Sequence, residues 1–296
     1  MSLKKLVRAL LPNPLDRLLK KAECKGQKRI LLFWNRGLGD IALGLYAIVH
    51  KIYAVIPDAR IVFVTRPNLV DGFALLENVE VIGVPGLQRG QEVDLGDYAE
   101  EFDLIIPRPD PTYWVSWQLG TLTPRLHWKS EWEPLWQSYG LSSTERYIGM
   151  HVQTETNYAS WRNWPLTSWE RLFKLLEGKA KVLLFGFEKE PHFDFPHLID
   201  LRGKTPLFSL LSIIKNRCSA LVVPDSGISA MTYFLDSSFP LQLVSLWGRP
   251  HMGILKQNVP SPNPLLRHVP LIGSGQKIEN ISPEQLFATL HIGGSF

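Results

Sequence analysis

The sequence has few cysteines and lacks any long apolar run. Its two cysteines, Cys24 and Cys218, cannot make a disulfide framework, which indicates a reducing compartment. No apolar run approaches the roughly 20 residues needed to cross a bilayer, and the first residues carry no signal-peptide pattern. We therefore expect a cytoplasmic protein that is soluble or at most peripheral to a membrane.

Patterns that bind metals are missing as well. There is no Asp-x-Asp pair, no His-Glu-x-x-His and no closely paired cysteines, so we expect no metal site. Three of the eight histidines, His127, His151 and His192, lie near the loops that hold the candidate functional residues described below. A lone histidine is more often structural than catalytic, and these three are assigned no role.

Charge is distributed unevenly along the chain. The sequence holds 32 basic and 28 acidic residues, a net charge of +4. Residues 1–29 hold nine of the basic and two of the acidic residues, so this segment contributes +7 and the remaining chain −3. A protein that binds nucleic acid spreads basic residues over a folded face, which the remaining chain does not do. No nucleic-acid partner is expected.

Residues 1–27 form a basic arm whose leucines are spaced by three and four, as on one face of a helix. Pro12 and Pro14 divide this arm into two short pieces. Two interpretations stay open. The arm is a solvated extension or a helix packed on the body, or it is a basic amphipathic anchor that contacts an anionic membrane.

The body alternates apolar strands with helices, which predicts parallel sheets covered by helices on both faces. A length of 296 residues predicts two such α/β domains, residues 28–145 and 146–296. A last helix opens at Ser282-Pro283, with packing back on the first domain as one option. The helix after Trp164-Pro165 should have Thr167 or Ser168 as its N-cap. The expected strands are 30–34, 59–65, 79–84, 104–106, 147–152, 181–185, 220–223 and 243–247, and the expected helices of the body are 41–55, 168–176, 206–215 and 228–235.

The first expected strand ends in a glycine loop, Gly37-Leu38-Gly39-Asp40. Its glycines allow a tight turn that exposes backbone N–H groups at a helix N-terminus, an arrangement that binds anions. The dinucleotide fingerprint Gly-x-Gly-x-x-Gly is not met, because Leu43 stands at the third glycine position and Gly44 follows one residue late. An NAD(P)-dependent dehydrogenase is therefore kept only as an alternative. Asp40 either caps the helix or accepts a proton from a nucleophile.

Two further loops hold candidate phosphate-binding residues. Residues 225–229, Asp-Ser-Gly-Ile-Ser, open a helix with small side chains, so that backbone N–H groups and hydroxyls can approach a phosphate. Arg162 stands just before the Trp164-Pro165 turn, where a guanidinium can hold a phosphate through two hydrogen bonds. The alternative for Arg162 is a surface arginine beside structural tryptophans.

These motifs occur in an order that resembles a known family. The strand-loop-helix segment 30–41, the Arg162-Asn163-Trp164-Pro165 turn, and the 225–229 loop followed by residues 244–248 resemble glycosyltransferase family 9, the family of the lipopolysaccharide core heptosyltransferases. The resemblance covers about residues 28–258. It implies a GT-B fold, in which two Rossmann-like parallel-sheet domains face a central cleft.

The resemblance also implies an activity. The protein would be an inverting, metal-independent transferase that moves a sugar, heptose from ADP-heptose, to a lipopolysaccharide-type or other surface-glycan acceptor. The nucleotide-sugar is its donor substrate, so no separate cofactor is implied. The first domain would bind the glycolipid or oligosaccharide acceptor, and the second the donor.

Roles for single residues follow from the same resemblance. Asp40 would be the general base that deprotonates the acceptor hydroxyl, and Arg162 would face the donor phosphate. Glu188 or Glu190 would contact the ribose, as an acid after the 183–186 strand does in the family. The pyrophosphate would lie against Ser226, Gly227, Ile228 and Ser229, with Asp225 and Gly39 in the same donor-binding set.

The sequence departs from the family at two positions of the second motif. Ser226 replaces a threonine, which keeps the hydroxyl, and Ala230 replaces a histidine, which removes a donor. A catalytically degenerate member that only binds a nucleotide or a partner is therefore a further alternative. Arg66, Arg108 and Arg125 are candidates for contacting an anionic acceptor. Five tryptophans either pack in the core or offer sugar-stacking faces in the acceptor half, namely Trp114, Trp117, Trp128, Trp132 and Trp136.

Overall fold

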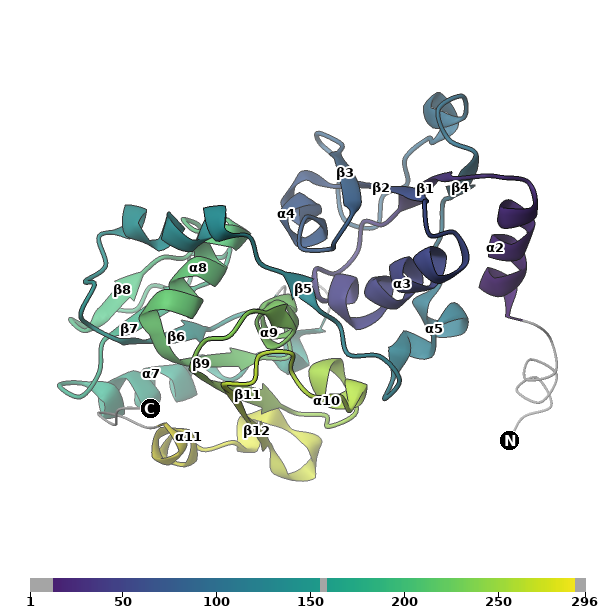
Figure 1. Cartoon of the computed structure of the whole chain (residues 1–296). Helices are drawn as coiled ribbons and strands as arrows, with labels where there is room; N and C mark the ends of the chain where they lie inside the picture. The colour runs from purple at the N-terminus through teal and green to yellow at the C-terminus, as the bar shows by residue number, and fades with distance from the viewer. Residues whose placement is uncertain (1–12, 155–158, 291–296) are drawn as a thin grey trace. The chain divides into compact units, whose positions relative to one another are not determined.

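The computed structural model describes residues 13–154 and 159–290, which divide into two compact units (Figure 1). Unit 1 extends to Pro124 and unit 2 begins at Arg125. Each unit contains a parallel sheet with helices packed against it, which confirms the expected mixed α/β class. No helix among the described residues has the length and apolar character required to cross a membrane.

Unit 1 is built on a four-stranded parallel sheet in the order β3-β2-β1-β4. Its strands are β1 (Arg29–Phe33), β2 (Arg60–Thr65), β3 (Val79–Gly83) and β4 (Leu104–Ile106). The middle strands read as nearly continuous apolar runs because helices and loops cover both faces of the sheet. Leu31, Val62, Val64 and Phe102 form a core cluster on one face.

A helix follows β1 and leads to β2. It opens with one π-helical turn, η1 (Ile41–Leu45), and continues as α3 (Tyr46–Val55). A Cβ atom on Gly44 would lie 2.6 Å from Cε3 of Trp117 and 2.7 Å from Cβ of Pro111. Gly44 therefore lets η1 pack directly on α5 (Pro111–Trp114) and η4 (Ser116–Gln118). Close packing accounts for this glycine, so no dinucleotide fingerprint is needed to explain it.

The second half of the basic arm is a helix. This helix, α2 (Pro14–Cys24), begins directly after Asn13, whose side chain accepts a hydrogen bond from Leu15 N and donates one to Trp114 O. Leu15 and Leu19 are fully buried, and α2 packs on α3. From Pro14 to Cys24 the arm is therefore a packed helix, with Leu15 and Leu19 on its buried face. The first expected helical piece lies outside the described residues.

We expect Leu19→Ala to lower the free energy of unfolding by about 2–5 kcal/mol, because the side chain is fully buried between α2 and the body. Chemical denaturation of the full chain measures this change. Lys20→Ala, on the exposed face of the same helix, is the matched control and should stay within about 0.5 kcal/mol of the parent. Equal stability of Leu19→Ala and the parent would contradict the packing of α2.

Unit 2 is built on a six-stranded parallel sheet in the order β12-β11-β9-β6-β7-β8. Across the sheet, the strands follow one another in one direction from β6 to β8 and in the opposite direction from β9 to β12. This is the strand order of the doubly wound nucleotide-binding fold. The expected strands are confirmed within a residue or two, whereas β8 and β12 had no sequence signal. The bounds are β6 (Tyr147–His151), β7 (Val182–Phe185), β8 (Leu198–Asp200), β9 (Cys218–Pro224), β11 (Leu241–Trp247) and β12 (Leu266–Ile272).

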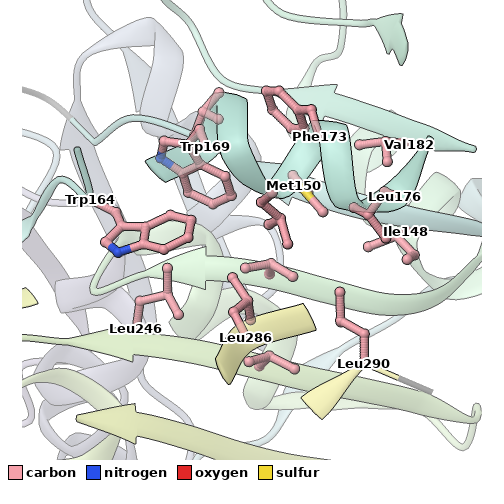
Figure 2. Packing of buried hydrophobic residues seen from close by; sticks show 14 of the residues in the cluster. Ile148, Met150, Trp164, Trp169, Phe173, Leu176, Val182, Leu246, Leu286 and Leu290 are labelled. Atoms are coloured by element: carbon pink, nitrogen blue, oxygen red, sulfur yellow. The ribbon is translucent and has the colours of Figure 1, made fainter. Parts of the chain in front are cut away.

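The helices of unit 2 close around one apolar core. Figure 2 shows Met150, Trp169, Leu246 and Leu286 pointing toward one another from β6, α7, β11 and α11. The last helix packs on α7 within unit 2. The bounds are α7 (Leu166–Leu176), α8 (Leu207–Arg217), α9 (Gly227–Tyr233), α10 (Gly253–Gln257) and α11 (Pro283–Thr289).

The start of α7 differs from the prediction. The helix begins at Leu166, with Pro165 at the N-cap position and no side-chain cap. The N–H groups of Ser168 and Trp169 both donate to the carbonyl of Pro165. The predicted caps Thr167 and Ser168 were wrong because the backbone of Pro165 already opens the helix.

The tryptophan-rich segment belongs partly to unit 2. Its second half forms η5 (Ser130–Tyr139), which packs on α8. Trp132 stacks on Phe208 with ring centroids 4.0 Å apart, and Trp128 packs edge-on against Trp132. The short strands β5 (Leu126–His127) and β10 (Leu235–Asp236) pair nearby. Trp132 is therefore a buried packing residue of unit 2.

Candidate active site

Each sheet has one point where the strand order reverses, and ligands of such sheets bind beyond the carboxyl ends of the strands there. In unit 1 this point lies between β1 and β4. In unit 2 it lies between β6 and β9, where Met150 pairs with Val222. The motif residues of the sequence follow these strands.

Asp40 follows β1, in the loop that leads to η1. Its Oδ2 accepts a hydrogen bond of 2.9 Å from Gly37 N, three residues earlier, where the first turn of the helix begins. An acid that accepts from the backbone N–H at a helix start is one half of a capping box, so the capping interpretation of Asp40 is supported. A Cβ atom on residue 37 would lie 2.9 Å from Asp40 Oδ2, so Gly37 makes room for the carboxylate. Gly39, the other glycine of the loop, is partly exposed.

The turn that carries Arg162 is anchored on both sides. Asn163 Oδ1 accepts hydrogen bonds of 2.8 Å from both the backbone N–H and the hydroxyl of Thr154, which follows β6. Trp164 is buried, and its indole N–H donates to Ile281 O at 3.0 Å. These contacts fix η6 (Ser160–Arg162) against the carboxyl end of β6.

Arg162 and Asp225 form an ion pair at this edge of unit 2. Arg162 Nε lies 3.7 Å from Asp225 Oδ2, and the carboxylate is nearly buried. Burial raises the pKa of Asp225, and the Arg162 guanidinium opposes that rise. A Cβ atom on Gly253 would lie 2.4 Å from Asp225 Oδ1, and Gly253 has φ +48°, so only glycine lets α10 begin this close to the carboxylate.

Ser226 and Ser229 form a reciprocal cap at the start of α9. Ser226 Oγ accepts from Ser229 N, and Ser229 Oγ accepts from Ser226 N and donates to Ser226 O at 2.7 Å. Both hydroxyls therefore bind the backbone of this turn; Ser229 is buried and Ser226 is partly exposed, and their contact with a phosphate stays a prediction. The N–H groups of Gly227 and Ile228 have no partner among the described residues, as expected for the first turn of a helix.

A second arginine reaches the same edge and was missed in the sequence. Arg249 follows β11, and its guanidinium lies 4.3 Å from the centroid of the Trp161 ring, with that of Arg162 at 5.4 Å. Trp161 is 36% exposed, an unusual position for an indole. The Gly248-Arg249 pair directly after an apolar strand is the signal that would have found it.

His151 ends β6 and is buried. Its Nδ1 has no partner within the described ranges, and burial lowers its pKa to about 4. A buried imidazole that stays neutral suits a structural role, in line with the sequence interpretation. Of the other two histidines, His192 is exposed and His127 lies in β5.

Unit 2 should lose stability in mild acid. Below its ordinary pKa of 6.5, His151 takes up a proton in the unfolded chain but not in the folded one until about pH 4. The free energy of unfolding should therefore fall by about 3 kcal/mol as pH drops from 6.5 to 4. His268, whose pKa burial also lowers to about 4, adds to the same trend. Denaturation at a series of pH values measures the slope.

His151→Leu should flatten part of that pH dependence, and His192→Leu, at an exposed position, should not change it. An unchanged slope in His151→Leu would show that this histidine is not held neutral in the folded protein.

The remaining predicted residues lie away from these contacts. Glu188 and Glu190 are exposed in the segment after β7, whereas the ordered acid of that region is Asp200, which binds the buried Arg202 at 2.7 Å. Ala230, at the family's histidine position, is buried in α9. The candidate acceptor arginines are engaged within their own units. Arg66 donates to Arg36 O, Arg108 pairs with Glu92, and Arg125 pairs with Asp236.

Within residues 13–154 and 159–290, no group of three or more His, Cys, Asp or Glu side chains is arranged to hold a metal ion. The chemistry available at the two edges is therefore that of Asp40 in unit 1 and of the Arg162–Asp225 pair, Arg249 and the α9 N–H groups in unit 2.

Comparison with known proteins finds solved structures that have a similar fold. No family model matches the sequence, and no curated protein matches it significantly. Among solved structures, the chain is similar to ADP-heptose lipopolysaccharide heptosyltransferase II of E. coli, with 18% identity, a TM-score of 0.64, and coverage of 88% of this chain and 96% of that one. It is also similar to a family 9 glycosyl transferase of Veillonella parvula, with 16% identity, a TM-score of 0.57, and coverage of 88% and 95%.

A more distant similarity is to the iron-containing dodecameric glycosyltransferase TibC of enterotoxigenic E. coli, with 15% identity and a TM-score of 0.50 over 82% of this chain and 62% of that one. The chain therefore has the fold of heptosyltransferases and family 9 glycosyltransferases over most of its length. This confirms, at the level of the fold, the resemblance that the motifs indicated.

Proposed function

We propose that the protein is an inverting glycosyltransferase that moves a sugar from a nucleotide-sugar, ADP-heptose in the first instance, to a surface-glycan acceptor. The observation that carries this proposal is the fold shared with heptosyltransferase II together with Arg162 and Arg249 at the carboxyl edge of the unit 2 sheet. That neighbour is named for its ADP-heptose substrate, which motivates the choice of donor.

Unit 2 binds the donor in this proposal. The N–H groups of Gly227 and Ile228 and the guanidiniums of Arg162 and Arg249 supply donors and positive charge for a diphosphate. Asp225 acts on Arg162, whose orientation it holds through the ion pair. Ser226 and Ser229 shape the turn through their cap. Glu188 or Glu190 contacts the ribose.

Unit 1 supplies the base. The acceptor hydroxyl oxygen attacks the anomeric carbon and its proton passes to the Asp40 carboxylate. The bond from that carbon to the diphosphate oxygen breaks, and the nucleoside diphosphate leaves with the electron pair. Attack opposite the leaving group inverts the anomeric configuration. The Gly37 N–H bond to Oδ2 holds the carboxylate in one orientation, which favours proton transfer.

Metal independence is part of the proposal. Two guanidiniums and two backbone N–H groups can offset the developing charge on the leaving diphosphate without a metal ion. Dialysis of the enzyme against a chelator should leave transfer unchanged. Loss of activity that added Mg²⁺, Mn²⁺ or Fe²⁺ restores would contradict this part.

The acceptor is a glycolipid or oligosaccharide, and we propose a peripheral, cytoplasmic location where such lipids are made. Lys20, Lys21 and Lys25 are exposed on or after α2, while Leu15 and Leu19 of this helix are buried. Contact of α2 with an anionic membrane would therefore be electrostatic and should weaken as salt rises.

The proposal is tested by a thermal-shift screen of nucleoside diphosphates and nucleotide-sugars, because a ligand of the folded state raises apparent stability by mass action. ADP and ADP-heptose should raise the melting temperature, and NADH should not. Radiolabelled transfer from the best donor to a lipopolysaccharide core acceptor then tests the activity. Binding without hydrolysis or transfer from any donor would favour the degenerate alternative, and an NADH response would favour the dehydrogenase.

A further inference from the structure

Three consecutive residues of unit 1 have a backbone conformation that L-amino acids rarely adopt. Ser116, Trp117 and Gln118, which form η4, have φ angles of +47°, +53° and +52°. Outside glycine such angles occur at single residues rather than in a run, because the Cβ atom approaches the next carbonyl oxygen. A strained run persists only where surrounding contacts hold it, and strain of this kind collects at functional sites. The contacts that hold η4 therefore indicate its role.

Two side chains of this left-handed turn contact η1. Gln118 is 1% exposed, and its Nε2 donates to Ala42 O at 2.7 Å. A carbonyl can only accept, so the side-chain atom that faces it must be the amide nitrogen. The Trp117 ring is the group that a Cβ atom on Gly44 would meet at 2.6 Å. A hydrogen bond and an aromatic contact thus hold η4 against η1.

The hydrogen bond from Gln118 reaches a carbonyl at which the π-helical turn departs from a regular helix. In an α-helix the N–H group of Tyr46 would donate to Ala42 O, four residues back. Here it donates to Ile41 O, five residues back. Gln118 Nε2 donates to Ala42 O in its place. Because a buried carbonyl needs a donor, the Gln118 side chain stabilises the π-helical form of η1 against the regular helix.

The form of η1 sets the direction of Asp40, which directly precedes it. A hydrogen bond over five residues holds one residue more per turn than a bond over four. Each residue of a helix turns the chain by about 100°. The helix that follows is fixed, since Ile48 and Ile52 of α3 are fully buried. Conversion of η1 to a regular helix would therefore rotate Asp40 by about 100° relative to α3.

We propose that Gln118 is a positioning residue for Asp40, because its bond to Ala42 O keeps η1 in the π-helical form that directs the carboxylate to the acceptor hydroxyl. Gln118 is buried, so it acts through η1 and not on the substrate. The strained turn presents this side chain to η1, which accounts for a run of left-handed residues without glycine. The inference rests on the proposed function, in which Asp40 is the base, and names a residue on which that base depends.

The variant Gln118→Met tests the inference. Methionine has a similar length but no N–H group, so the packing is kept and the bond to Ala42 O is lost. The kcat for sugar transfer should fall by about 10–10²-fold, since small displacements of a reacting group have effects of this size. KM for the nucleotide-sugar should stay at the parental value. A merely structural role would lower the melting temperature but leave kcat per folded molecule unchanged.

Thr112→Val is the matched control. It removes the hydroxyl that accepts from Trp117 Nε1 at 2.9 Å, beside the same strained turn, and leaves the bond from Gln118 to Ala42 O in place. The control should transfer at the parental rate. Parental kcat in folded Gln118→Met, or an equal loss of kcat in both variants, would overturn the inference.

A double variant shows whether the effect passes through the base. In the Asp40→Asn background, Gln118→Met should cause no further loss of the residual transfer, because the carboxylate that Gln118 positions is already gone. The same fold-loss in both backgrounds would show that Gln118 acts on something other than Asp40, which would also overturn the inference.

A crystal structure of Gln118→Met separates this inference from the proposed transfer. We expect η1 to become a regular helix and the Asp40 carboxylate to be displaced. An unchanged η1 and Asp40 would overturn the inference whether or not the protein transfers sugar. A displaced Asp40 in a protein that uses no nucleotide-sugar would instead refute the transferase and keep Gln118 as the residue that fixes this carboxylate.

Discussion

Asp40→Asn is expected to reduce sugar transfer by about 10²–10⁴-fold, the usual contribution of a general base. Asparagine has the same shape, and its side-chain oxygen can still accept from Gly37 N, so the loop should keep its geometry. The amide, however, cannot take the proton of the acceptor hydroxyl. Steady-state transfer at saturating donor and acceptor measures the effect on kcat.

Donor binding should be unchanged in Asp40→Asn, because the donor site that we propose belongs to unit 2. Thermal shift with ADP checks this. Asp58→Asn is the control, an exposed acid of the same unit that pairs with Lys28, and it should transfer at the parental rate. Normal turnover by Asp40→Asn would refute the assignment of the base.

Replacing Arg162 by glutamine is the second large change. The variant loses a cation that stabilises the leaving diphosphate, so kcat should fall by about 10²–10³-fold. It also leaves Asp225 buried without its ion-pair partner, which should lower the stability of unit 2. A fall in activity alone would therefore be ambiguous between chemistry and folding.

The double variant Arg162→Gln/Asp225→Asn resolves that ambiguity. Burial raises the pKa of Asp225, which means that the ionised carboxylate costs stability in the folded protein, and the neutral amide removes that cost. The double variant should regain stability in chemical denaturation but remain inactive. Recovery of transfer together with stability would show that Arg162 serves the fold and not the reaction.

Much of the fold was readable from the sequence because it depends on local apolar patterns. The strands β1, β7 and β9 contain the apolar runs 30–33, 182–185 and 220–223, and the order of these runs with the intervening helices predicted parallel sheets. The strand β12 was missed because Arg267, His268 and Pro270 interrupt its pattern, and only pairing with β11 makes it a strand. Tertiary contacts, rather than local preference, decide such segments.

The candidate site was predicted only in part, for similar reasons. The glycine loop and the 225–229 loop were found because turns and caps have short-range signatures. The sequence did not show that the hydroxyls of Ser226 and Ser229 bind each other's backbone, nor that Arg249 shares the ring of Trp161 with Arg162. These facts depend on side-chain direction and on neighbours that are distant in the chain.

One anchor of the Arg162 turn bears on how the protein is made. The indole of Trp164 donates to a carbonyl 117 residues further along the chain, and Gln242 likewise donates to Thr289 near the end of the last helix. During synthesis on the ribosome, unit 1 has all its strands early, whereas unit 2 lacks the partner of Trp164 until residue 281 has emerged. Nascent chains arrested before that point should therefore fail to retain ADP, and longer ones should retain it.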